Sequence, residues 1–259
     1  MIGALADRRV LVVGAGTRPS PDPDAPIGNG RAIAVAAGRA GATVACADVD
    51  VAAAEATAGL VRAEGAAAHV LTADVTDADA CAALVEAAAT AMDGLDGLVC
   101  NVGIGAGMGM AGTTPEQWDA VFAVNVRSHF LLARAALAAM PPGGSIVFIS
   151  SIAGLTAGSR IPAYDSSKAA ITGLCRQVAA EGARRGIRAN VVAPGLIDTP
   201  LGRLATGDRP SRAKAPVPLG RQGTAWEVAG PVVFLLSDAA SYITSQQLAV
   251  DGGLTGCRG

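Results

Sequence analysis

The sequence predicts an α/β fold: a single domain, spanning residues 1–259, built on a doubly wound parallel sheet with helices on both faces. Apolar runs of strand length alternate with helical patterns along the whole chain. No proline- or serine-rich linker and no repeat interrupts this alternation. The composition is 51% hydrophobic but only 3% aromatic, with 33 glycines, which suits helices packed closely on a sheet.

The first elements are a strand at residues 9–13, a glycine-rich loop, a helix at 31–41 and a strand at 42–48 that ends in Asp48. This is the layout of a Rossmann-like, dinucleotide-binding βαβ unit. Glycines let the backbone approach a pyrophosphate, and the helix N-terminus offers free N–H groups to it. Asp48 can accept hydrogen bonds from a ribose and would repel a 2′-phosphate, so we predict NAD rather than NADP.

The same alternation predicts the remaining elements. Helices are expected at 51–65, 76–92, 115–140, 164–185 and 224–238, with Thr76 or Asp77 as the N-cap of the second. Strands are expected at 66–75, from 95, at 143–151, from 186 and at 245–253. Ligands of such sheets bind at the carboxyl ends of the strands, so the loops that follow them are candidates for a site.

Tyr164 and Lys168 are four residues apart at the start of the 164–185 helix, which places both on one helix face. An ammonium beside a phenol favours the phenolate, so we predict that the pKa of Tyr164 lies below its usual value of about 10. Such a tyrosine can exchange a proton with a substrate oxygen. Ser151, at the end of the preceding strand, could hold that oxygen. Taken alone, the pair fits a structural role equally well.

Composition excludes other kinds of site. The net charge is −2 and the basic residues are mostly scattered, so neither nucleic acid nor an anionic membrane is an expected partner. No apolar run is long enough to span a bilayer and no signal-peptide core opens the chain, so we expect a cytoplasmic protein. Five dispersed cysteines predict reduced thiols. The two histidines, His69 and His129, lack metal-ligand spacing, so no metal site is predicted, and His129 is expected to be structural.

Taken together, the motifs resemble the short-chain dehydrogenase/reductase family over nearly the whole chain. The resemblance rests on an ordered set of short motifs, which are the glycine loop, Asp74-Val75, Asn101-Val102-Gly103, Asn125, Ser151, Tyr164, Lys168, Pro194-Gly195 with Ile197 and Thr199, and Asp251-Gly252-Gly253. It implies hydride transfer between a nicotinamide cofactor and a secondary alcohol or ketone.

The resemblance also implies roles for single residues. Tyr164 would be the general acid/base, Lys168 would bind the nicotinamide ribose and lower the tyrosine pKa, and Ser151 would polarise the substrate oxygen. Asn125 would hold a water that links Lys168 to solvent. The other cofactor contacts would come from the glycine loop and from later strand ends, namely Gly14, Thr17, Gly28, Asn29, Gly30, Asp48, Asp74, Val75, Asn101, Gly103, Pro194, Ile197 and Thr199.

The chain departs from the family pattern in two places. Gly14 is separated from Gly28 by an inserted, proline- and aspartate-rich stretch, residues 18–26, which we call the insert and expect to be a surface excursion. The fourth strand runs into Cys-Asn-Val-Gly where the family usually has Asn-Asn-Ala-Gly. Arg18, at the start of the insert, is a basic residue that could bind a 2′-phosphate, although Asp48 is the stronger determinant.

The substrate is not named by the sequence. Met108 and Met110 offer adaptable apolar contacts. A later segment could be a lid that attracts an anionic substrate or simply a solvated loop, since it sets Arg203, Arg209, Arg212 and Lys214 against Asp208. Two alternatives to an NAD-dependent dehydrogenase remain: an NADPH-dependent 3-oxoacyl thioester reductase and a non-catalytic dinucleotide-binding regulator.

Family members are often oligomers, so a homotetramer or homodimer is expected. The helices of two subunits could approach closely through small residues, which are Ala133, Ala136, Ala169 and Ala170. A core-facing stripe in a monomer would look similar, so the expected oligomer rests on the resemblance.

Overall fold

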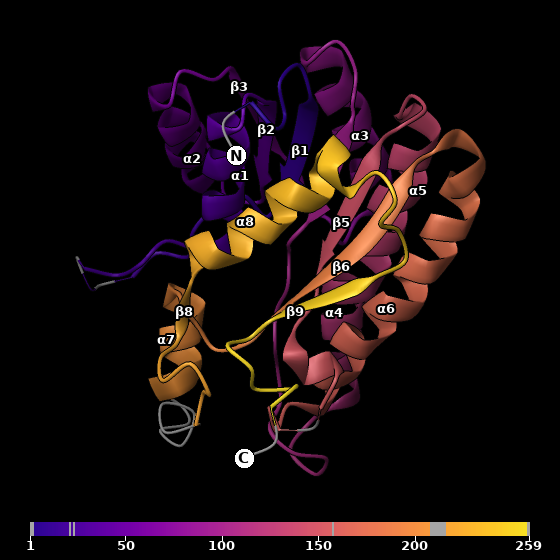
Figure 1. Cartoon of the computed structure of the whole chain (residues 1–259). Coiled ribbons are helices and arrows are strands. Elements are labelled where there is room, and N and C mark those ends of the chain that lie inside the picture. Colours follow the sequence, from indigo (N-terminus) through magenta and orange to yellow (C-terminus); the bar gives the residue numbers. More distant parts are fainter. Residues whose placement is uncertain (1–2, 21, 23, 157, 208–215, 258–259) are drawn as a thin grey trace.

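The protein is organised around a seven-stranded, fully parallel sheet with strand order β3-β2-β1-β4-β5-β6-β9 (Figure 1). The computed structural model describes residues 3–20, 22, 24–156, 158–207 and 216–257. The strands of this sheet are β1 (Arg9–Val13), β2 (Thr43–Asp48), β3 (Ala68–Thr72), β4 (Gly97–Cys100), β5 (Ser145–Ile149), β6 (Arg188–Pro194) and β9 (Gln247–Val250). The predicted fold class is confirmed.

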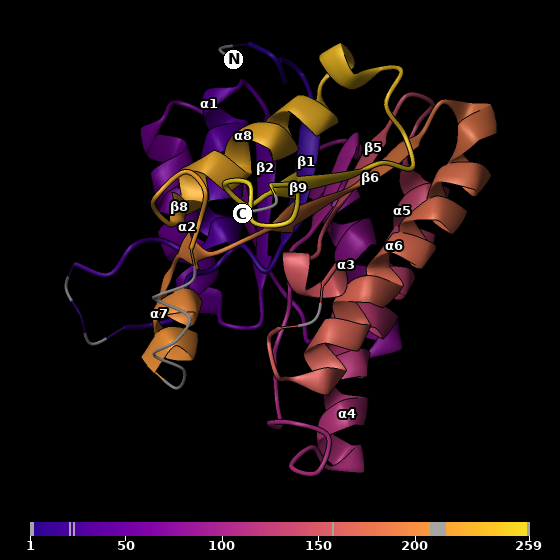
Figure 2. The same ribbon diagram turned by 60° about the horizontal axis from the view of Figure 1, so that its bottom comes forward.

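The helices between the strands are α1 (Asn29–Arg39), α2 (Val51–Ala63), α3 (Ala78–Ala91), α4 (Pro115–Phe122), α5 (Ser128–Ala139), α6 (Pro162–Gly182), α7 (Pro200–Gly207) and α8 (Ala225–Leu236). Helices α1, α2 and α8 cover one face of the sheet, and α3, α5 and α6 cover the other (Figures 1 and 2). Each face has its own buried apolar core, because a parallel strand presents hydrophobic side chains to both sides.

Register brings three strand ends together. Val13, the last residue of β1, pairs with Ala47 of β2 on one side and with Cys100 of β4 on the other. The loops that leave β1, β2 and β4 therefore begin side by side at the carboxyl edge of the sheet, where ligands of doubly wound folds bind.

The region predicted as one helix from 115 to 140 is two helices joined by a π-helical turn, Ala123–Arg127, with Asn125 inside it. Such a turn is a one-residue bulge that is frequent at functional sites. By length and composition alone, Pro115–Ala139 is apolar enough to cross a membrane, but part of it is buried in the core. Ala133 and Ala136, expected on a helix-pairing face, belong to that core, so this expectation is wrong for them.

Two further elements lie near the carboxyl edge. The segment that begins at Pro200, expected to be a lid or a solvated loop, starts as helix α7, and Thr199 Oγ1 accepts a hydrogen bond from the Gly202 amide at 3.0 Å. Before and after it, β7 (Ile197–Asp198) and β8 (Gly223–Thr224) form a short parallel pair. Arg209, Arg212, Lys214 and Asp208 of the expected lid lie outside the described residues.

Candidate active site

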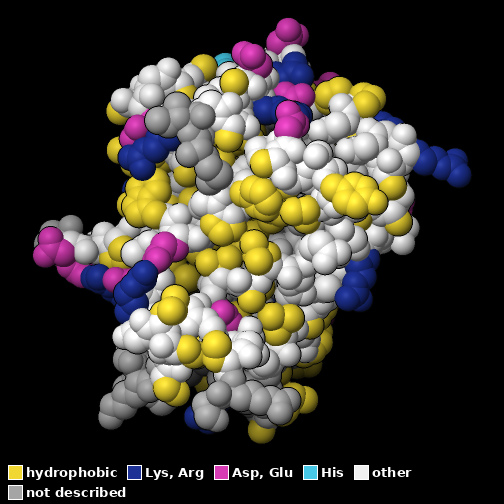
Figure 3. All heavy atoms as spheres, viewed as in Figure 1, with side chains coloured by type: hydrophobic (Ala, Val, Ile, Leu, Met, Phe, Trp, Pro, Cys, Tyr) yellow, Lys and Arg dark blue, Asp and Glu magenta, His cyan; other side chains and the backbone are white. Residues whose placement is uncertain are grey.

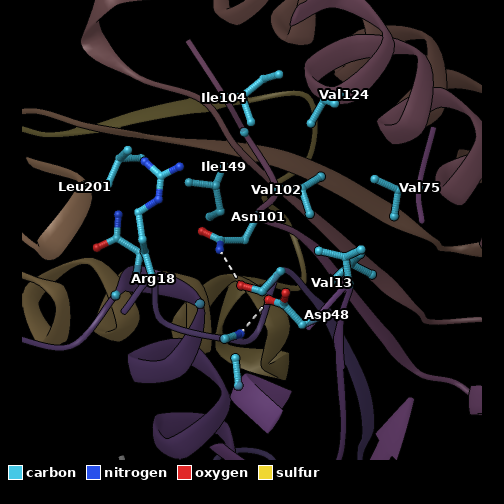
Figure 4. Close-up of a pocket in the computed structure, with 18 of the residues that line it drawn as sticks. Val13, Arg18, Asp48, Val75, Asn101, Val102, Ile104, Val124, Ile149 and Leu201 are labelled. Atoms are coloured by element: carbon cyan, nitrogen blue, oxygen red, sulfur yellow. Dashed lines mark hydrogen bonds between the residues drawn. The ribbon is translucent and has the colours of Figure 1, made fainter. Parts of the chain in front are cut away.

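A cavity of about 570 Å³ crosses the carboxyl edge of the sheet, a size typical of cofactor sites. Residues from the loops after β1, β2, β3, β4 and β5 line it, together with the start of α7 and the first turns of α1 and α6. The predicted site residues in its lining are Gly14, Thr17, Gly28, Asn29, Gly30, Asp48, Asp74, Val75, Asn101, Gly103, Tyr164, Lys168 and Thr199. Figure 4 shows part of this lining.

Glycine is required at two positions of the loop after β1. Gly14 has φ of +80°, and a Cβ there would lie 2.9 Å from the Val102 side chain. At Gly30, in the first turn of α1, a Cβ would lie 1.8 Å from the Gly14 carbonyl oxygen and 2.6 Å from Asn101 Nδ2. The absence of a side chain at Gly14 and Gly30 lets α1 pack directly against the strand ends, so the N-terminus of the helix faces the cavity.

The N-terminus of α1 has the features of an anion-binding site. Gly28 is the N-cap of α1 and has no side chain to bond the first-turn amides, and the first turn contains no acidic residue. Thr17 Oγ1 accepts from the Gly28 amide at 3.0 Å and ties the two ends of the insert together. Asn29 Oδ1 is buried and has no partner among the described residues. A free acceptor beside free amides fits the ribose–phosphate backbone of a dinucleotide.

Asp48 lies at the other side of the glycine loop. Its Oδ2 accepts from the Gly16 amide at 2.8 Å, and its Oδ1 accepts from the Asp50 amide at 3.2 Å. The carboxylate is therefore held at the β2 end, in the cavity wall. Arg31 is nearby, but its guanidinium donates to Thr57 Oγ1 at 3.0 Å and so points towards α2.

Asp74 and Val75 extend the same wall. Asp74 Oδ1 accepts from both the amide and the hydroxyl of Thr76, at 2.9 and 2.8 Å, and these bonds lower the pKa of Asp74. The carboxylate is thus charged and oriented before any ligand arrives. Val75 is buried beneath it.

The loop after β4 forms the floor. Asn101 Nδ2 donates to the Gly14 carbonyl oxygen at 2.8 Å, which joins the β1 and β4 loops (Figure 4). His129 Nε2 lies 3.2 Å from the Val102 carbonyl oxygen. Burial, together with the charge of Lys168, lowers the pKa of His129 to about 3, so a neutral imidazole donates to that oxygen. His129 has the structural role that its place in the helix suggested, and its partner was not visible in the sequence.

Tyr164 and Lys168 line the end of the cavity nearest β5. Lys168 Nζ donates to the Ile149 carbonyl oxygen at 3.1 Å and lies 5.7 Å from the centre of the Tyr164 ring. Burial lowers the pKa of Lys168 to about 8. At neutral pH the ammonium form therefore still predominates, and its charge is close to the phenol.

Asn125 lies beneath this end and is fully buried. Its Oδ1 accepts from the Ile104 amide at 2.8 Å, and its Nδ2 donates to the Ile104 carbonyl oxygen and to Ser167 Oγ, both at 2.9 Å. Ser167 in turn donates to the Tyr164 carbonyl oxygen at 2.7 Å. The side chain thus clamps the cavity floor to the helix that carries Tyr164.

Besides Asn125, three predicted residues lie outside the described lining of the cavity. Ser151 precedes a short 3-10 turn, and its Oγ accepts from the Ala153 amide at 3.1 Å, which leaves the hydroxyl proton available to a substrate oxygen. Pro194 ends β6 and Ile197 begins β7, and both are buried. The neighbours Ser150, Pro200 and Leu201 line the cavity instead.

The insert approaches the far side of the cavity. Arg18 and Pro19 contribute to the lining, opposite Pro200 and Leu201 of α7. Arg203 of α7 binds Asp198 through Nε and Nη2, at 2.8 and 3.0 Å. The same guanidinium also binds Asp22 of the insert at 2.5 Å. Figure 3 shows basic and acidic side chains side by side at the left of the view, where the insert and α7 lie.

Comparison with known proteins agrees with this geometry. A family model described as enoyl-(acyl carrier protein) reductase matches residues 26–255. The 2-(S)-hydroxypropyl-CoM dehydrogenase 3 of Xanthobacter autotrophicus is 41% identical over 210 residues, which are 78% of this chain and 82% of that protein. The cyclopentanol dehydrogenase of a Comamonas species is 38% identical over 200 residues, 75% of this chain and 80% of that protein.

Solved structures extend the similarity to almost the whole chain. A short-chain type dehydrogenase/reductase from Mycobacterium marinum has a TM-score of 0.90 at 32% identity and covers 98% of this chain and 97% of that one. Levodione reductase has a TM-score of 0.90 at 31% identity, covering 98% and 100%. Relatives of this kind are named dehydrogenases and reductases, and the short-chain dehydrogenase/reductase family uses nicotinamide cofactors. The chain belongs to the short-chain dehydrogenase/reductase family and is an oxidoreductase acting on CH–OH groups.

Proposed function

We propose that the protein is an NAD-preferring dehydrogenase or ketone reductase for secondary alcohols, with Tyr164 as the general acid/base. One observation carries the proposal: a single cavity has the α1 N-terminus and Asp48 in one part of its lining and Tyr164 with Lys168 in another. A dinucleotide that lies along this cavity would have its phosphates at α1 and its reactive end beside the tyrosine.

The nicotinamide, when bound, supplies the hydride acceptor or donor. The chain's residues handle the proton. In alcohol oxidation the Tyr164 phenolate takes the proton of the substrate hydroxyl, and in ketone reduction the neutral Tyr164 phenol donates its proton to the substrate oxygen. The Lys168 ammonium favours the phenolate through its charge, and Ser151 donates its free hydroxyl proton to the substrate oxygen. The hydrogen bonds of Asn125 hold the loop that contains Ile104 against the helix that carries Tyr164.

The NAD preference rests on Asp48. Its carboxylate is held by the Gly16 and Asp50 amides at the end of β2, where the adenosine ribose of a bound dinucleotide would lie. A 2′-phosphate would meet this negative charge at close range, and Arg31 is engaged elsewhere. One structural relative, from Agrobacterium tumefaciens, was solved with bound NADP. Family membership therefore does not decide the cofactor, and this residue is the basis for the choice.

The test measures the binding of the cofactor first and the turnover of candidate substrates second. NAD and NADP are titrated by calorimetry, and nicotinamide absorbance is then followed with a panel of open-chain and cyclic secondary alcohols. We expect tighter NAD binding. A Tyr164→Phe variant should bind NAD normally and lose turnover by about 10²-fold or more. Tyr242→Phe is the matched control, because Tyr242 is the other tyrosine of the chain and is fully exposed. Normal turnover by Tyr164→Phe would overturn the proposed mechanism.

A second candidate is an NADPH-dependent 3-oxoacyl thioester reductase. The observation in its favour is a 38% identity over 162 residues with the 3-oxoacyl-[acyl-carrier-protein] reductase of Escherichia coli, which is 62% of this chain and 66% of that protein. Including a 3-oxoacyl thioester with NADPH in the panel separates the two. An Asp48→Ser variant should lower the NAD-to-NADP affinity ratio by about tenfold or more, because it removes the repelling charge.

A third candidate function is that of a non-catalytic, dinucleotide-binding regulator. One relative, 44% identical over 200 residues, is named an inactive 2-(S)-hydroxypropyl-CoM dehydrogenase 2, so membership of the family does not by itself establish turnover. The presence of Tyr164, Lys168, Asn125 and Ser151 in one neighbourhood favours an enzyme, because a sensor needs no proton donor. Normal cofactor binding with no turnover across the whole panel would favour the regulator.

We also propose that the protein is a homotetramer or homodimer. Ala133 and Ala136 are in the core, but Phe130 on the same helix is 45% exposed, with Arg134 stacked over its ring at 5.5 Å. An exposed aromatic side chain on an apolar helix is a frequent component of subunit interfaces. Light scattering of the purified chain tests this, and a monomer across the concentration range would exclude it.

A further inference from the structure

We propose that Arg18, the first residue of the insert, is an additional cofactor-binding residue whose guanidinium contacts the pyrophosphate of the dinucleotide. The proposal rests on the proposed function, in which this cavity holds a nicotinamide dinucleotide. It assigns to the insert a purpose that its sequence does not reveal: it supplies a cation to a phosphate site otherwise built from uncharged backbone groups.

The base of the insert fixes where Arg18 starts. The Thr17 hydroxyl accepts from the Gly28 amide at 3.0 Å, so residue 18 leaves the main fold directly beside the first turn of α1. Both Arg18 and Pro19 line the cavity, and the proline restricts the backbone that follows the arginine. An arginine side chain anchored there can reach the amides at the start of the helix, where a phosphate would sit.

The charge of Arg18 is not used elsewhere in the described part of the chain. Its side chain is exposed and makes no hydrogen bond or ion pair with a described residue. The other basic side chain in the described lining is Lys168, which is buried and donates to the Ile149 carbonyl oxygen beside Tyr164. Arg18 is therefore the cation available to the two negative charges of a pyrophosphate.

The direction of the side chain separates this role from recognition of a 2′-phosphate. Figure 4 shows Arg18 extending away from Asp48, on the side of the cavity where Leu201 lies. The adenosine ribose is expected at Asp48, in a part of the lining that also contains Asp50 and Asp74 and is negatively charged. A guanidinium on the opposite side of the glycine loop is placed for the phosphates between the two nucleosides.

The test uses ligands that differ in their phosphates. Calorimetric affinities are measured for NAD, NADP, ADP and adenosine with the wild type, Arg18→Gln, Arg18→Lys and, as a matched control, Arg62→Gln. Arg62 is an exposed arginine of α2 paired with Glu55 at 2.6 Å, and it does not line the cavity. We expect Arg18→Gln to weaken NAD, NADP and ADP alike by about tenfold, leave adenosine unchanged and reduce the salt dependence of NAD binding. Arg18→Lys should recover part of the affinity.

Two results would overturn the proposal. Weakening of NADP alone would show that Arg18 reads the 2′-phosphate, and equal affinities in Arg18→Gln and wild type would show that its charge stays in solvent. Failure of the wild type to bind NAD, NADP or ADP is a different result, since it would overturn the proposed function itself and the role of Arg18 with it.

Discussion

Replacing Lys168 by methionine should stabilise the cofactor-free protein while it abolishes turnover. The lysine is buried, and burial moves its pKa from 10.5 to about 8. This difference corresponds to about 3 kcal/mol of unfavourable free energy when the native protein holds the charged form. Methionine fills a similar volume without a charge. It also removes the hydrogen bond to the Ile149 carbonyl oxygen, which costs about 1 kcal/mol, so a net gain of about 2 kcal/mol remains at pH 7.

The sign of the pH dependence follows from the same shift. Below pH 8 the lysine is protonated in both the native and the unfolded state, and the full penalty is present. Between about pH 8 and 10.5 the native lysine loses its proton first, so the wild type gains stability relative to Lys168→Met. Above 10.5 the lysine is neutral in both states and the penalty is gone. The advantage of the variant should therefore shrink through this window.

The assay is urea unfolding of both proteins at pH 7 and at pH 10.5. Burial raises the pKa of Cys46 and Cys175 to about 12, so these thiols make both proteins less stable as the unfolded thiols ionise at alkaline pH. Because both proteins share them, the difference between wild type and variant isolates Lys168. Equal stabilities at pH 7, or an advantage that does not change with pH, would refute the reasoning.

Three further predictions follow from the contacts at the site. Gly30→Ala should destabilise the fold by about 3 kcal/mol or more in urea unfolding, because its Cβ would meet the Gly14 carbonyl oxygen, whereas Gly59→Ala, on an open helix surface, should be neutral or stabilising. Asn125→Ala should lower the thermal midpoint of unfolding and should reduce kcat more than NAD affinity, because it releases the cavity floor from α6, the helix that carries Tyr164. An unchanged midpoint would show that the hydrogen bonds of Asn125 do not stabilise the fold. Asp22→Asn should change NAD affinity by less than about threefold in calorimetry. The ion pair between Asp22 and Arg203 is exposed, and Arg203 keeps its two bonds to Asp198 in the variant. A larger loss of affinity would mean that this ion pair holds the insert in place.

Local patterns in the sequence were sufficient for the fold and for most of the cavity. Strand and helix periods are short-range signals, so β1, β2 and α1 could be placed within one or two residues. Because parallel strands end at one edge of the sheet, the loops after them had to converge there. Thr76 and Asp77 were both candidates for the N-cap of α3 by side-chain type, and the structure has Asp77 in that place.

What could not be predicted depends on contacts between distant segments. The π-helical turn at Asn125 follows from bonds to Ile104 and Ser167, which no helical period reveals. Ala133 has the same small side chain whether it faces a partner or the core, so only the packing decides. The contact between the insert and Arg203, far along the chain, likewise could not be predicted from the composition of the insert.

The closure of the insert by one hydrogen bond has a consequence for how this protein can vary. The chain leaves the fold at Thr17 and returns at Gly28, two residues joined at 3.0 Å. An excursion whose ends already touch can gain or lose residues at little entropic cost, because closure entropy grows only with the logarithm of loop length. The loop is thus a place where evolution, or an engineer, can exchange one cofactor-facing segment for another while the sheet, both cores and the catalytic helix stay as they are.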